Sequence, residues 1–179
     1  MRDVCKRKIY GFSLIEVSIV LLIAGIIFGA VLKGKDLIEQ AKIRSVAADF
    51  FNLQSFISLY STDYNDLFDQ PFLVWEKLHA ASMAPSPNPP NSKLGGSFSI
   101  SRIYGKHYLT LAAVDHEDEG EGRAFLTFSQ AKSLYAKLTS DQSGDSDAVI
   151  VQNSKGDVVN INKIKYSTND RFSVSLLIE

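Results

Sequence analysis

With 179 residues, the chain has room for one ordinary domain and little more. Hydrophobic residues make up 45% and charged residues 22%, a globular composition that excludes a largely disordered chain. The formal net charge of −1 argues against a generally basic, nucleic-acid-binding protein. The single cysteine, Cys5, excludes an intramolecular disulfide and a zinc site built from cysteines.

The apolar residues are concentrated near the N-terminus. Residues 12–32 read FSLIEVSIVLLIAGIIFGAVL, with one charge in 21 positions. A helix of this length spans about 31 Å, roughly the thickness of a bilayer's hydrocarbon core. The basic residues before the run predict a cytoplasmic N-terminus, with the rest of the chain across the membrane. A secretory signal peptide fits less well because the run is too long. A plain single-pass anchor is the simpler alternative.

Glu16 lies inside this apolar run and is its only charge. An ionised carboxylate at membrane depth costs at least ~2.5 kcal/mol, and the run holds no Lys or Arg to neutralise it. A partner must therefore come from a chain terminus, from another protein or from the membrane edge. The alternative is that the side chain reaches back to the cytoplasmic headgroups.

Residues 8–17, KIYGFSLIEV, resemble the type III signal of type IV pilins and type II secretion pseudopilins. That signal has a basic leader, a Gly before the cut, an aromatic first mature residue, Glu at the fifth position and a long apolar run. The resemblance implies cleavage between Gly11 and Phe12 by prepilin peptidase, followed by N-methylation of Phe12. Losing residues 1–11 leaves 15 of the 19 basic and 19 of the 20 acidic residues, a formal charge of −4, and no cysteine.

Cleavage would create the partner that Glu16 needs. In a filament, Glu16 of one subunit would neutralise the Phe12 α-ammonium of its neighbour, because an unpaired buried charge is strongly penalised. Such a pair would favour one axial stagger, as a buried polar group fixes register in coiled coils. Gly25 and Gly29 have the small-x-x-x-small spacing that lets helices approach closely.

The remaining partners and the location also follow from the resemblance. It implies the prepilin peptidase/methyltransferase, other pilin or pseudopilin subunits, and an inner-membrane assembly platform. The chain would cross the bacterial inner membrane once, with a head that is periplasmic, or extracellular after assembly. We therefore divide it into a leader (1–11), a transmembrane and filament-core helix (12–34), an amphipathic continuation of that helix (35–62) and a globular head (63–179).

The pattern of the continuation and the head predicts an α+β fold. Between Ile43 and Tyr60, apolar residues recur every three or four positions, which indicates one buried helix face. A short helix follows within residues 71–81, in which we expect Trp75 to lie in the core. Residues 84–96 hold four of the five prolines and predict an extended loop.

Alternating apolar and polar residues then predict a small antiparallel sheet. We expect a hairpin of residues 97–104 and 107–114 turning at Gly105-Lys106, and a helix at 129–138. A second hairpin, of residues 148–151 and 158–161, and a closing strand at 172–176 complete the prediction. The result is a long helix packed on a small antiparallel sheet, as in pilins.

Two acidic segments are candidate binding sites. Residues 115–122 are expected to be a solvated loop, because runs of like charge are usually exposed. Asp141, Asp145 and Asp147 are candidate calcium ligands, since hard cations prefer several oxygen donors, although the segment does not match an EF-hand loop. No other cofactor is predicted.

Nothing in the sequence indicates an enzyme. The three histidines share no spacing typical of a metal site or catalytic relay, and no phosphate-binding or nucleophile motif occurs. The sequence predicts a structural subunit of a type IV pilus-like filament or a secretion pseudopilus. The alternatives are a membrane-anchored binding module that does not polymerise and a minor pilin for DNA uptake. The acidic mature chain weighs against nucleic acid as a partner.

Overall fold

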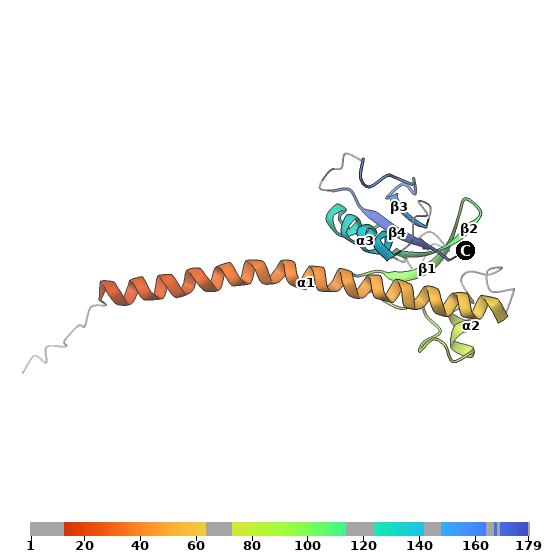
Figure 1. Ribbon diagram of the computed structural model, residues 1–179, viewed down its shortest axis with the longest axis horizontal. Coiled ribbons are helices and arrows are strands. Elements are labelled where there is room, and N and C mark those ends of the chain that lie inside the picture. The colour runs from red at the N-terminus through yellow and green to blue at the C-terminus, as the bar shows by residue number, and fades with distance from the viewer. Residues whose placement is uncertain are drawn as a thin grey trace, which may run out of the picture. The chain divides into compact units, whose positions relative to one another are not determined.

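The computed structural model describes residues 13–63, 73–113, 124–141, 148–163, 167 and 169–178. Its elements are α1 (Leu14–Asp63), α2 (Val74–Ala80), β1 (Ser97–Ile103), β2 (Lys106–Ala112), α3 (Phe128–Asp141), β3 (Val149–Asn153) and β4 (Phe172–Leu177) (Figure 1). The chain divides into two units, Met1–Gln40 and Ala41–Glu179, each described by itself below.

The described part of the first unit is helical from Leu14 onward. Apart from Glu16 and Ser18, its side chains up to Leu32 are apolar on every side of the helix, and nearly all of them are exposed. By length and composition α1 qualifies as a membrane-spanning helix. A helix that is apolar all round needs either lipid or other protein around it.

The second unit is built on one sheet of four strands in the order β1-β2-β4-β3, all neighbours antiparallel (Figure 1). Register sets which side chains share a face: Ile100 lies opposite Leu109, and Leu109 lies opposite Leu176. Since successive side chains of a strand point to opposite faces, one face of the sheet is apolar. The predicted α+β class and the antiparallel sheet are confirmed.

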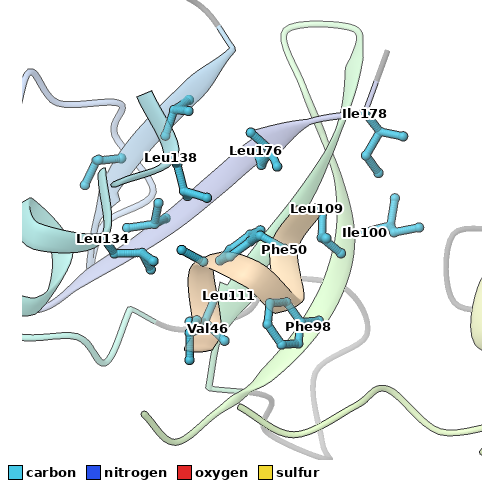
Figure 2. Close-up of a cluster of buried hydrophobic side chains, with 14 of the residues drawn as sticks. Val46, Phe50, Phe98, Ile100, Leu109, Leu111, Leu134, Leu138, Leu176 and Ile178 are labelled. Carbon is cyan, nitrogen blue, oxygen red and sulfur yellow. The ribbon is translucent and has the colours of Figure 1, made fainter. Parts of the chain in front are cut away.

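Two helices cover this apolar face. The part of α1 after Gln40 contributes Val46 and Phe50, and α3 contributes Leu134 and Leu138, to one cluster with the strands (Figure 2). The rings of Phe50 and Phe98 meet edge to face with centroids 5.0 Å apart. The predicted amphipathic face between Ile43 and Tyr60 is thus buried against the sheet, and Trp75 of α2 is buried in the same core as expected.

Hydroxyl groups line part of the other face of the sheet. Thr110 of β2 forms hydrogen bonds with Ser101 of β1 (2.5 Å) and with Ser175 of β4 (2.8 Å). Thr110 and Ser175 are both buried. Three strands are therefore linked through side chains as well as through their backbones.

The first hairpin turns one residue earlier than predicted. Ile103 pairs with Lys106, so the turn is Tyr104-Gly105 and not Gly105-Lys106. Tyr104 and Gly105 have φ values of 51° and 82°. A two-residue turn with positive φ at both positions matches the right-handed twist of the strands, and Gly105 adopts its position without steric cost.

The predicted strand at residues 158–161 is wrong. Only an isolated bridge joins Val158 to Gln152, and β3 finds its strand partner in β4. The Val159 amide still donates to the Val151 carbonyl at 2.8 Å, but Ile161 then enters the hydrophobic core. The Asn153 amide likewise donates to the Asp157 carbonyl at 3.0 Å, so the two segments form a short turn and not a second paired strand. The other predicted elements occur with small shifts of their ends, while residue 114, placed in the second strand, lies outside the described residues.

Candidate assembly site

Glu16 lies in the first turn of α1. The Ser13 carbonyl accepts hydrogen bonds from the Glu16 amide at 3.0 Å and from the Val17 amide at 3.2 Å, which begins the helix. A carboxylate in the first turn is favoured by the partial positive charge of the helix N-terminus. The Glu16 side chain is exposed. Gly11 and Phe12, the predicted cleavage and methylation residues, lie outside the described part of the chain.

The surroundings of Glu16 are apolar. From Leu14 to Leu32 no basic side chain occurs, and no ion pair to Glu16 forms within the part of the chain that the structure describes. A carboxylate moved with this helix into lipid or into a helix bundle would therefore need a cation from outside the run.

Gly25 and Gly29 are accessible at the helix surface. A Cβ atom built on either glycine would meet nothing within 4 Å. Gly25 follows Glu16 by nine residues, or about two and a half turns, so the two lie on opposite sides of α1. One straight helix packed along the Glu16 side of α1 would therefore not also contact Gly25.

The predicted calcium ligands cannot be assembled from the described residues. Asp141 ends α3, but its side chain and the residues Asp145 and Asp147 lie outside the described part, as do residues 115–122. Among described residues, no group of three or more His, Cys, Asp or Glu side chains is placed to hold a metal ion. The calcium site stays a prediction.

The two described histidines lie in different surroundings. His79 Nδ1 is 2.9 Å from the Ala84 carbonyl at the end of α2. Partial burial, and then the nearby Arg102 charge, lower the pKa of His107.

One feature was missed by our reading of the sequence. Three small or apolar residues, Gly34, Leu37 and Ile38, follow the apolar run within a charged stretch, and the two larger ones are exposed. Their spacing of three and four residues was the available signal. Because charged residues surround Gly34, Leu37 and Ile38, the stretch reads as polar and this spacing was overlooked.

Residues 6–32 match the family model of the prokaryotic N-terminal methylation motif. The chain carries a prepilin-type methylation motif. The matched segment ends where the apolar run ends, and it contains Gly11, Phe12 and Glu16. The resemblance to the signal of type IV pilins and pseudopilins is thereby confirmed.

Two further comparisons were made with the complete sequence and the fold. No curated protein matches it. Among solved structures, the chain is similar to the major type IV pilin PilA1 from Clostridium difficile, with 20% identity and a TM-score of 0.48. That similarity covers 79% of this chain and 96% of the pilin.

Proposed function

We propose that this protein is a structural subunit, a pilin or pseudopilin, that is cut by prepilin peptidase and assembles into a type IV pilus-like filament or secretion pseudopilus. The observation that supports this most is the methylation motif at residues 6–32, which overlaps a helix that exposes apolar side chains on every side. Before assembly, the helix is held in the inner membrane with its N-terminus in the cytoplasm. Its role is assembly and not catalysis.

In the proposed assembly mechanism, the apolar run of α1 exchanges its contacts with lipid for contacts with protein. During assembly, contacts among α1 helices replace contacts with acyl chains, so the apolar run stays out of water throughout. Glu16 must find a cation in that bundle, and the α-ammonium freed at Phe12 of an adjacent subunit supplies one. Because separating the two charges inside a bundle is costly, the pair selects the stagger between subunits.

Processing is tested by expressing the full chain with and without a prepilin peptidase. We expect mass spectrometry to find a chain shortened by residues 1–11 that begins with N-methylated Phe12. A chain that still begins at Met1 in the presence of the peptidase would contradict the proposal. It would favour a membrane-anchored module that never polymerises.

Assembly is tested by Glu16→Ala. We expect this variant to be cleaved and inserted normally but to yield few or no filaments by electron microscopy, because the Phe12 ammonium loses its partner. The matched control is Glu39→Ala, which removes a carboxylate from the same helix beyond the apolar run and should leave the filament yield unchanged. Normal yield from Glu16→Ala would show that the pair does not direct assembly.

A further inference from the structure

The turn of the β1–β2 hairpin carries an exposed aromatic residue in a strained backbone conformation. Tyr104 is 85% exposed, and its φ of 51° lies in a region that Gly or Asn enters at lower cost. Asn is the usual residue at the first position of a two-residue turn that continues with Gly, as this one does with Gly105. Because so exposed a ring gains little packing within the chain, the strain points to a role outside it.

Basic side chains lie on both faces of the hairpin next to this ring. Arg102 and His107 are paired across the strands and share one face, while Lys106, the next residue of β2, lies on the other. Arg102 and Lys106 are exposed. Residues 97–112 include no acidic residue. The end of the hairpin therefore presents positive charge on either side of an aromatic tip.

The turn lies at the end of the second unit that α1 reaches last. The carbonyl of Leu177, which pairs with Tyr108 in the sheet, accepts a hydrogen bond from the Gln54 side chain at 2.8 Å. The other end of the hairpin follows the loop of Lys93, whose ammonium donates to the Ser45 hydroxyl at 2.6 Å. Gln54 lies about 13 Å beyond Ser45 along the helix. The turn thus belongs to the end of the unit that is farther along α1 from the apolar run.

A lipid surface fits this arrangement better than a linear polyanion does. A narrow turn with cations on opposite faces offers no single surface along which a polymer could lie. When such a turn enters a layer of headgroups, phosphates surround it, so the cations of both faces find a partner. A tyrosine side chain has an apolar ring and a polar tip, and it is enriched at membrane–water interfaces. Shape and charge together therefore favour anionic lipid headgroups.

We infer that the β1–β2 turn, with Tyr104 at its tip and Arg102 and Lys106 beside it, docks on the anionic lipid headgroups of a second bilayer, separate from the one that holds α1. The ring enters the headgroup layer, and the two cations contact lipid phosphates on either side. One turn carries few charges, so a single copy binds weakly and several copies on one surface bind through avidity. This docking goes beyond the proposed filament function and needs no filament.

Vesicle docking tests the inference with the full chain. The chain is held by its apolar helix in phosphatidylcholine vesicles, and energy transfer between lipid dyes measures the binding of a second set of vesicles rich in phosphatidylglycerol. We expect Arg102→Gln combined with Lys106→Gln to reduce docking about tenfold or more, and added salt to weaken it. The matched control, Lys155→Gln, removes an exposed cation from the turn after β3 and should leave docking unchanged.

Tyr104→Asn separates docking from folding. We expect this variant to lose most of the docking while its free energy of unfolding stays the same or rises, because Asn-Gly is the preferred pair for this turn. Unchanged docking would overturn the role of the ring.

Three further outcomes would also overturn the inference. Equal docking to second vesicles of phosphatidylcholine alone would show that headgroup charge does not matter. An equal loss from Lys155→Gln would leave only the net charge of the chain. Binding of soluble heparin through Arg102 and Lys106, without vesicle docking, would assign the turn to a soluble polyanion. Because no filament is needed, a failure of assembly would refute the proposed function and leave this test intact.

Discussion

Gly96 precedes β1 at a position where no side chain fits. A Cβ atom there would lie 2.6 Å from the Ala112 carbonyl oxygen and 2.6 Å from the Phe125 ring, and φ is +67°. We expect Gly96→Ala to lower the free energy of unfolding by about 2–3 kcal/mol, through both the clash and the strained backbone. Because Trp75 is the only tryptophan and is buried, its fluorescence in urea reports the unfolding of the second unit.

The control for this substitution is Gly105→Ala. Gly105 also has a positive φ, of 82°, but a Cβ atom there meets nothing within 4 Å. Its cost should be limited to the backbone strain of about 1–2 kcal/mol. Equal losses for the two variants would show that the contact with Ala112 and Phe125 does not matter.

His107 gives the second unit a dependence on pH. Since burial and Arg102 lower its pKa in the folded state, the unfolded chain takes up a proton first as pH falls below the ordinary value of 6.5. The stabilisation is fully present above pH 6.5 and is lost as pH falls toward the folded pKa. We expect His107→Gln to lose less stability than the unmodified chain between about pH 7 and pH 5 in urea titrations.

Arg102→Gln is the companion variant for this measurement. It removes the smaller of the two causes and keeps the burial, so its loss of stability with falling pH should lie between those of the other two chains. A His107→Gln profile identical to that of the unmodified chain would assign the pH dependence to other groups.

Single residues differ in how well the sequence identifies them. Glu16 stands out in the sequence as a candidate site because a charge inside an apolar run contradicts its surroundings; its role stays a prediction. The turn position of Tyr104 does not stand out, because an aromatic residue at positive φ contradicts its own preference and depends on the pairing of the two strands. The conflict at Glu16 is visible in the sequence, whereas the conflict at Tyr104 arises only when the two strands pair.

The strands of the sheet are joined through Thr110. Thr110→Val keeps the shape but removes the hydroxyl, which leaves the fully buried Ser175 hydroxyl without this partner. We expect the free energy of unfolding to fall by about 1–3 kcal/mol, measured by Trp75 fluorescence in urea. Ser99→Val, at a partly exposed site on the same face of β1, should change it by less than about 0.5 kcal/mol. A loss no larger for Thr110→Val than for Ser99→Val would contradict the role of the hydroxyl pair.

Among the helices and strands, those in which apolar residues recur at a regular spacing over several turns or alternations were predictable. The recurrence from Ile43 to Tyr60 and the alternation in residues 97–103 each follow from one face being buried. Residues 158–161 have the composition of a strand, but Ile161 packs into a core formed by other elements, which the local sequence does not indicate. The exposed apolar side chains of Leu37 and Ile38 were not predicted, because in the described part of the chain they belong to no buried face.

At the scale of the whole molecule, the proposed processing would change the charge as well as the length. The leader carries four basic residues and one acidic residue, so its removal takes the formal charge from −1 to −4. We expect isoelectric focusing to show a shift to an isoelectric point below the 6.3 of the full sequence when the peptidase is present. A Gly11→Leu variant, which blocks the predicted cleavage point, should keep the position of the full chain. A peptidase-dependent shift in that variant would place the cut elsewhere.

The position of β4 in the sheet has a consequence for the proposed export of the second unit. Among the described strands it comes last in sequence, yet it lies between β2 and β3 and is the strand with which β3 pairs. The first hairpin can form early, but the two halves of the sheet join only when residues 172–177 are available. If the second unit is exported as proposed, its sheet is complete only once residues 172–177 have crossed the membrane, so a subunit stalled during translocation would expose unpaired strand edges to its neighbours.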